Sequence, residues 1–189
     1  ETITLDFDHL VANRISLPIR FHDYRKIVGK FGLKNFEFHM SYQDVTRIGE
    51  LKDELQSVMT PDMQFSIHLP DYISSNYLIN PFSQDEEIKH NSRRIIDECV
   101  EFACFLESYT SKKCPIVGSF SVYEVASKSE FYAAYRELFG EVLERSNIAI
   151  VPQFLPRKAW YFGGSYELDV FCSLDDLKYY KQMPSGICL

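Results

Sequence analysis

Short apolar runs that alternate with amphipathic segments are the feature that most constrains the fold of this chain. Such runs occupy residues 13–19, 35–40, 63–69, 114–120 and 148–154. They are mostly continuous rather than alternating, which is typical of strands that are covered on both faces. Strands that are joined by helical segments need crossover connections, so the pattern predicts a parallel α/β sheet. No linker or low-complexity segment interrupts it, and residues 1–189 are predicted to form a single domain.

The segments between these runs carry apolar residues at helical spacing. The clearest stripe steps by four and three residues and consists of Ile88, Ser92, Ile95, Cys99, Phe102 and Leu106. Ser83 precedes it, and Glu86 follows Ser83 by three residues, which predicts a capping box at the start of the helix. Ser127 and Glu130 have the same spacing and predict a second capping box.

Two parallel-sheet architectures fit this pattern, and the residues at the strand ends distinguish them. A doubly wound sheet normally has a glycine-rich phosphate loop, but the chain contains neither a GxGxxG nor a Walker A pattern. A (β/α)8 TIM barrel has its active site at the carboxyl ends of its strands. Polar residues stand at those ends here, namely Glu37, His39, His68, Ser119 and Gln153. We therefore predict a TIM barrel that is incomplete as given, with about its first five and a half β/α units and a sixth strand that starts at 186–189.

The composition argues against several classes of function. The formal net charge of −7 gives a nucleic-acid partner no electrostatic support. No stretch approaches the roughly 20 apolar residues of a membrane span, and the start, "ETITLDFDHL", lacks the features of a signal peptide. The five cysteines are odd in number and include no CxxC pair. We therefore expect reduced thiols in a cytoplasmic protein and no zinc ribbon.

A histidine and a glutamate at the strand ends are the candidate catalytic groups. Imidazole transfers protons near neutral pH, and His68 stands where the third strand ends. Glu37 is expected to orient a substrate hydroxyl or to polarise His68, and His39 lies on the same face of its strand. The alternative is structural, with a hydrogen-bonded wall histidine and a carboxylate that bonds a neighbouring strand or Arg14.

Two further residues are candidate substrate contacts. Arg14, in the first apolar run, is expected to bind an anionic substrate. Trp160 belongs to "WYFGG" in a long loop, and aromatic residues beside glycine hinges are typical of a lid or a sugar-stacking wall. The alternatives are a solvated arginine and an aromatic residue that only packs the loop.

Several motifs, in their order and spacing, resemble the xylose isomerase-like TIM barrels, a family that includes sugar-phosphate isomerases and epimerases. The first helix runs into "FGLKNFEF", which contains Glu37, and the third strand reads "FSIHLPDY", where the family has an active-site histidine, here His68. The stretch "SQDEEIKHNSRRIIDECVEFACFL" resembles the helix that follows this strand in the family. The stretches "IAIVPQFLP" and "SGICL" resemble the family's fifth and sixth strands. The resemblance covers nearly the whole chain and implies an active site around Glu37 and His68.

Gln153 departs from the pattern of that family. The resemblance implies a glutamate at this position that binds a divalent metal, Mn, Zn or Mg. A neutral amide is a poorer ligand and offers no charge compensation. Gly118 and Ser119 stand near a position where some members have a histidine. We therefore expect an altered metal site in which Gln153 contacts the substrate, with the other implied ligands on strands six to eight.

The resemblance predicts a sugar or sugar-phosphate isomerase or epimerase that moves a proton next to a carbonyl with the help of a divalent metal. One alternative is a non-catalytic relative that binds a sugar or a partner protein at the barrel mouth. Another is an endonuclease IV-type DNA-repair enzyme, against which the acidic balance and Gln153 argue. The expected partner is a small sugar or sugar phosphate, with no nucleic acid and no membrane. The exposed edges of an incomplete barrel leave a homo-oligomer open.

Overall fold

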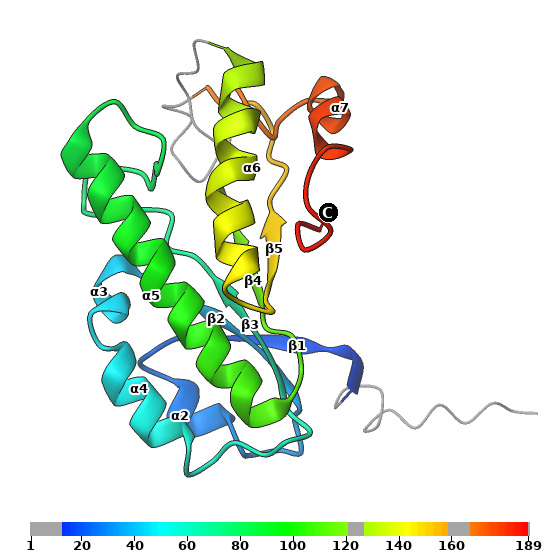
Figure 1. The fold of residues 1–189 in the computed structure, drawn as a ribbon. Coiled ribbons are helices and arrows are strands. Elements are labelled where there is room, and N and C mark those ends of the chain that lie inside the picture. The colour runs from blue at the N-terminus through cyan, green and yellow to red at the C-terminus, as the bar shows by residue number, and fades with distance from the viewer. Residues whose placement is uncertain (1–12, 121–126, 159–166, 189) are drawn as a thin grey trace, which may run out of the picture.

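A five-stranded parallel sheet forms the centre of the protein in the computed structural model, which describes residues 13–120, 127–158 and 167–188 (Figure 1). The strands are β1 (Ser16–Ile19), β2 (Asn35–His39), β3 (Gln64–His68), β4 (Pro115–Gly118) and β5 (Ala149–Pro152). They lie in the sheet in chain order, and every neighbouring pair is parallel. The parallel sheet predicted from the sequence is confirmed. The carboxyl ends of all five strands therefore lie at the same end of the sheet.

The sheet is open in the described part of the chain, because β1 and β5 lie at its two edges. A single parallel bridge joins Ile187 to Ile150 beside β5. The Ile150 amide donates to the Gly186 carbonyl at 2.9 Å, and the Cys188 amide donates to the Ile150 carbonyl at 2.8 Å. The predicted sixth strand is thus present as one bridge in the expected place. The described residues do not form a closed barrel.

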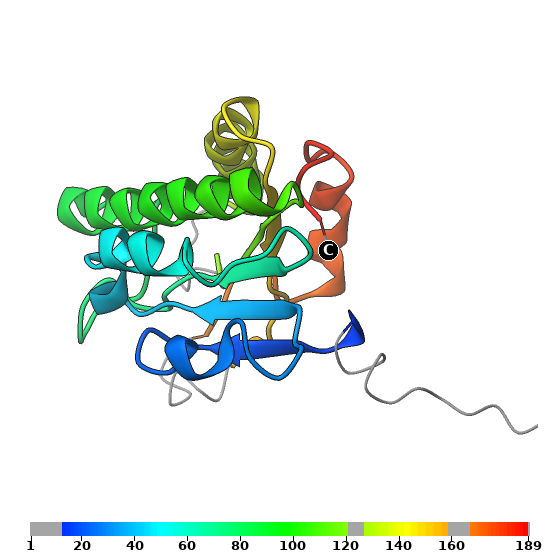
Figure 2. The same ribbon diagram turned by 90° about the horizontal axis from the view of Figure 1, so that it is seen from below.

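Helices connect the strands, and the two longest lie side by side along the sheet (Figure 1). The helices are α2 (Tyr24–Ile27), α3 (Tyr42–Val45), α4 (Ile48–Leu55), α5 (Glu86–Thr110), α6 (Lys128–Glu144) and α7 (Leu177–Tyr180), with a 3₁₀ helix η2 (Leu174–Asp176) before α7. α5 packs against β3 and β4, and α3 and α4 pack beside α5 (Figure 2). This arrangement covers one face of the sheet.

The start of α5 differs from the predicted capping box. The N-cap is Asp85, whose Oδ1 accepts from the amides of Glu87 at 2.9 Å and Ile88 at 3.1 Å. Ser83 Oγ instead accepts from the amide of Asp85 at 3.1 Å. A carboxylate also interacts favourably with the positive end of the helix dipole, which explains why Asp85 takes the position. At α6 the prediction is confirmed for Ser127, which is the N-cap.

The face of the sheet that the helices cover is apolar. Phe36 and Phe38 of β2 and Phe65 and Ile67 of β3 are buried there. The ring of Phe38 packs edge-on against Phe102 of α5, with 5.3 Å between the ring centroids. Since side chains alternate along a strand, the residues between these positions must point to the opposite face. The buried face thus fixes which side chains are available at the other one.

Tyr135 of α6 lies at the centre of a buried aromatic cluster. Its ring packs against those of Phe139 and Phe171, at centroid distances of 4.6 Å and 5.1 Å. Within the described residues its buried hydroxyl has no hydrogen-bond partner. Burial raises the pKa of this hydroxyl well above its ordinary value, since a phenolate would be still harder to bury. The ring therefore stabilises the core while the hydroxyl opposes its own burial.

Tyr135→Phe is expected to raise the free energy of unfolding by about 1 kcal/mol, because it removes an unsatisfied buried hydroxyl and keeps the ring. Tyr132→Phe is the matched control, because the Tyr132 hydroxyl accepts from the buried amide of Phe171 at 3.0 Å. That change should lower the free energy of unfolding by about 1–3 kcal/mol. Urea denaturation measures both. A loss of stability in Tyr135→Phe would show that its hydroxyl has a partner after all.

The cysteines and the helices bear on two of the remaining expectations. All five cysteines are free of disulfide bonds, and Cys99 and Cys114 are buried, which agrees with the prediction of reduced thiols. Within the described ranges, no helix is both long enough and apolar enough to cross a membrane.

Candidate functional site

The candidate site lies on the face of β2 and β3 that the helices leave uncovered. Glu37 and His39 share this face of β2, and Ser66 and His68 share it on β3. Glu37 is paired in register with Ser66, and His39 with His68. All four residues are half-buried. The structure therefore brings together Glu37 and His68, which were predicted to be catalytic, and adds His39 beside them.

Glu37 and His39 form a hydrogen-bonded pair. His39 Nε2 lies 2.7 Å from Glu37 Oε1, and Ser66 Oγ donates to Glu37 Oε2 at 3.2 Å. An ionised carboxylate only accepts, so His39 Nε2–H is the donor. The side chains of His39 and Glu37 are 30% and 28% exposed, which leaves them within reach of a ligand on this face. Glu37 thus polarises His39 rather than His68, and it also bonds the neighbouring strand, as in the structural alternative.

The hydrogen bond of His68 determines which of its nitrogens carries a proton. Nδ1 lies 3.0 Å from the carbonyl oxygen of Leu69, which can only accept. Nδ1 therefore carries the hydrogen, and in the neutral ring Nε2 has the lone pair. A lone pair in a fixed direction is what a general base requires.

The two imidazole rings are stacked at the carboxyl ends of β2 and β3. The centroids of His39 and His68 lie 4.8 Å apart, and the ring planes differ by 19°. Glu37 holds the ring of His39, and the ring of His39 lies flat against that of His68. Glu37 therefore acts on His68 indirectly, by fixing the plane in which the imidazole lies.

Asp71 is a carboxyl group next to these rings. It follows β3 by three residues, and its backbone carbonyl accepts from the amide of Ile79 at 2.9 Å. Burial raises the pKa of the Asp71 carboxyl, and the nearby His68 and His39 imidazoles offset part of this rise. The site thus combines a carboxyl whose protonated form is favoured by burial with an imidazole whose Nε2 accepts a proton.

A pocket of about 310 Å³ opens beside Asp71 at the carboxyl ends of β1, β2 and β3. It is lined by Arg20, Met40, Ser41, Tyr42, Pro70, Asp71, Tyr72, Ser74 and Ser75. We call it the carboxyl-end pocket. Its lining joins one guanidinium group to several hydroxyl groups, which suits a small ligand with hydroxyl and anionic groups. Its size is at the lower end of that of small-molecule sites.

Sequence reasoning missed Arg20 and Asp71. Arg20 follows directly after Ile19, the last residue of β1, and Asp71 stands just beyond the end of β3. Both positions follow the carboxyl end of a parallel strand, where sites in parallel sheets are built. Applying this rule to the residues that follow each strand, and not only to the residues within it, would have identified both.

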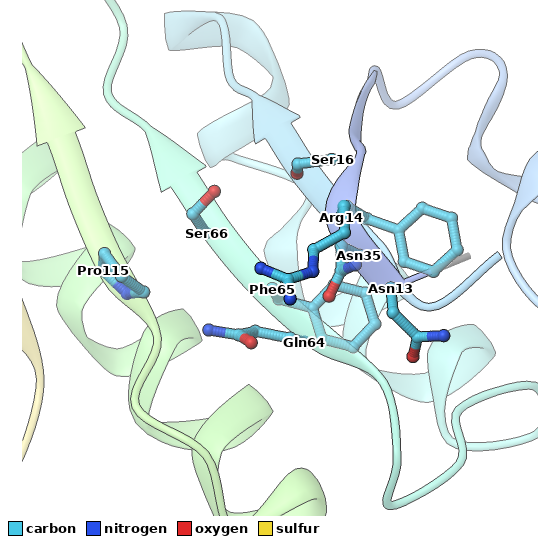
Figure 3. A pocket seen from close by; sticks show the side chains of 9 residues that line it. Asn13, Arg14, Ser16, Asn35, Gln64, Phe65, Ser66 and Pro115 are labelled. Carbon is cyan, nitrogen blue, oxygen red and sulfur yellow. The ribbon is translucent and has the colours of Figure 1, made fainter. Parts of the chain in front are cut away.

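Arg14, predicted to bind substrate, lies at the opposite end of the sheet. It precedes β1 and lines a separate pocket at the amino ends of the strands (Figure 3). Asn35 of β2 lines this pocket too, and four residues separate it from His39, which corresponds to about 13 Å along a strand. The structure therefore does not bring Arg14 together with His68.

Gln153 lies at the carboxyl end of the strands, as His68 does, but two strands away from it. It follows β5, and its backbone N–H donates to the backbone carbonyl of Gly118 at 2.9 Å. It is half-buried. Adjacent strands lie about 4.8 Å apart, so a ligand that touches both Gln153 and His68 has to span about 10 Å. Its contact with substrate stays a prediction, and Trp160 lies outside the described residues.

Leu69 leaves little room for a side chain at position 118. A Cβ at Gly118 would lie 3.0 Å from Leu69 Cδ1 and 3.1 Å from its Cβ. A histidine, which the resemblance suggests near this position, would require the Leu69 side chain to shift by a few tenths of an ångström.

The described residues do not assemble a site for the expected divalent metal. They contain no group of three or more histidine, cysteine, aspartate or glutamate side chains that is placed to hold an ion. His39 Nε2 and Glu37 Oε1 are bonded to each other, and Gln153 offers a neutral amide.

Comparison with known proteins adds no family. No protein-family model matches the chain, and no curated protein matches it. The resemblance to the xylose isomerase-like barrels therefore rests on the motifs quoted from the sequence, and it stays a prediction.

Proposed function

We propose that this chain belongs to a sugar or sugar-phosphate isomerase or epimerase with TIM barrel architecture, and that its reaction is proton transfer next to a carbonyl. The observation that supports this most is the fixed ring of His68, whose Nδ1 bonds the Leu69 carbonyl. Asp71 lies beside it and lines the carboxyl-end pocket. His68 is not among the lining residues of that pocket and stands at the end of β3, three residues before Asp71. A base and an acid are the groups that enolisation needs.

In the proposed reaction, His68 Nε2 takes the proton from the carbon next to the carbonyl. The electrons of the broken C–H bond form a C=C bond, and the carbonyl oxygen takes the proton of the Asp71 carboxyl. An enediol results. Return of the proton from His68 to the neighbouring carbon, with return of that carbon's hydroxyl proton to Asp71, gives the isomer. Epimerisation would need a second proton donor on the opposite face of the carbon that lost its proton.

Arg20 and the hydroxyl groups of the carboxyl-end pocket would bind the substrate in this reaction. A guanidinium group bonds phosphate or carboxylate through two parallel N–H donors. Ser41 and Tyr42 also line the pocket, and Ser41 Oγ donates to Asp44 at 2.8 Å and is thereby held in place. This lining favours a phosphorylated sugar over a neutral one.

A second candidate function is binding without catalysis, and Gln153 supports it. The resemblance implies a glutamate at this strand end, and the amide of glutamine neither takes up a proton nor balances the charge of a cation. The same pocket would then bind a sugar or sugar phosphate and leave it unchanged.

Solvent exchange separates the two candidates. The full chain is incubated in D2O with aldoses, ketoses and their phosphate esters, and ¹H NMR follows the hydrogen next to each carbonyl. Ligand-observed NMR reports binding in the same samples. We expect at least one phosphate ester to bind and to lose that hydrogen to solvent.

The remaining outcomes are equally informative. Binding without exchange would support the non-catalytic candidate and contradict the isomerase. Neither binding nor exchange across the panel would contradict both. Arg20→Gln is the matched variant for the substrate class, and it should weaken binding of the phosphate esters more than binding of the free sugars.

A further inference from the structure

A second polar pocket lies at the amino ends of the strands, away from His68. It has a volume of about 270 Å³ and is lined by Asn13, Arg14, Ser16, Asn35, Phe36, Gln64, Phe65, Ser66 and Pro115. We call it the Arg14 pocket. Ser16, Asn35 and Gln64 lie in one register row across β1, β2 and β3, so their side chains share the uncovered face of the sheet.

The lining of the Arg14 pocket is rich in hydrogen-bond donors. It contains one guanidinium group, three carboxamides and two serine hydroxyls, and none of its lining residues is acidic. Figure 3 shows the Arg14 side chain reaching from the segment before β1 across β2 towards Gln64 of β3. Donors from the segment before β1 and from β2 and β3 therefore line one space.

The nearest carboxylate is already bonded elsewhere. Glu37 lies two residues along β2 from Asn35, which is about 7 Å at the rise of a strand. Its Oε1 bonds His39 and its Oε2 accepts from Ser66 Oγ. Ser66, which lines the Arg14 pocket, is the in-register neighbour of Glu37. The donors of His39 and Ser66 offset part of the Glu37 charge and so reduce its repulsion of an anion bound near Arg14.

We propose that the Arg14 pocket is a second binding site, which takes a small molecule with an oxyanion, a phosphate or a carboxylate group. Arg14 would hold the oxyanion through two parallel N–H donors, and the carboxamides of Asn35 and Gln64 would bond its remaining oxygens. The volume suits a molecule somewhat smaller than the ligands of ordinary small-molecule sites. The proposal is independent of the proposed function, because Gln64, whose carboxamide would bind the ion, lies about 13 Å along β3 from His68.

The test is a titration of ¹⁵N-labelled full chain with inorganic phosphate and, separately, with malonate. The side-chain amide signals of Asn35 and Gln64 report on the Arg14 pocket alone. We expect a saturable shift of these signals with phosphate, with malonate or with both, which identifies the preferred oxyanion. Arg14→Gln keeps a hydrogen-bonding side chain without the charge and should weaken this binding by about tenfold or more.

Two further variants make the result decisive. Arg14→Lys keeps the charge and loses the forked geometry, so it should retain part of the affinity. Arg20→Gln changes the other pocket and should leave the shifts of Asn35 and Gln64 unaltered. The proposal is overturned if neither ion shifts these signals saturably, or if Arg20→Gln abolishes the shift and Arg14→Gln does not.

Discussion

His68→Asn is expected to slow the exchange of the substrate hydrogen by about 10²- to 10⁴-fold while the protein stays folded. The amide nitrogen of asparagine takes approximately the place of Nδ1, so it still donates to the Leu69 carbonyl, which His68 Nδ1 now reaches over 3.0 Å. Asparagine has no counterpart of Nε2, and the base is lost while the hydrogen bond is kept. ¹H NMR in D2O measures the exchange rate, and urea denaturation measures the free energy of unfolding.

Other variants separate a chemical role of His68 from a structural one. His90 is exposed on α5, so His90→Asn should change neither the exchange rate nor the stability. Glu37→Gln should have a smaller effect on the rate than His68→Asn, because Glu37 orients His39 and reaches His68 only through the stacked ring. An exchange rate in His68→Asn equal to that of the unchanged protein would exclude His68 as the base.

The order of the sheet could be predicted from the sequence because a parallel arrangement leaves a mark on every strand. Buried strands are short apolar runs, and the segments between them have to be long enough for a crossover. The five strands of the structure all lie within the predicted runs. Closure of the sheet is different, since it depends on how β1 and β5 meet other strands. No local pattern in either strand encodes that.

The candidate site could be predicted only in part, and strand ends explain the difference. Alternation along β2 and β3 is a local property, so it correctly placed Glu37 and His68 on one face. Arg14 and Arg20 both flank β1, and only the bounds of that strand decide which of them stands at the carboxyl end. The partner of Glu37 was missed as well, because a hydrogen bond to His39 competes with one to His68 by geometry alone.

Asp176→Asn is the second change with a large expected effect, and it should lower the free energy of unfolding by about 3 kcal/mol. The Asp176 side chain has 0% exposure. Its carboxylate accepts from Lys128 Nζ at 2.8 Å, from the amides of Cys172 at 3.1 Å and Ser173 at 2.9 Å, and from Ser173 Oγ at 2.9 Å. An asparagine would turn an N–H group towards some of these donors. Asp175→Asn is the matched control on an exposed neighbour and should change stability by less than about 0.5 kcal/mol.

The pH dependence of this difference tests its electrostatic origin. Burial alone would raise the pKa of the Asp176 carboxyl, but the Lys128 ammonium and the donors of Cys172 and Ser173 outweigh burial and hold that pKa below its usual value. A carboxyl with a lowered folded pKa contributes its stabilisation fully above the unfolded pKa, about 3.9, and loses it as the pH falls towards the folded value. The difference in unfolding free energy between the unchanged protein and Asp176→Asn should therefore be constant near neutral pH and shrink below about pH 4. A difference that persists undiminished into that acidic range would mean that lost packing, and not the lost charge, destabilises the variant.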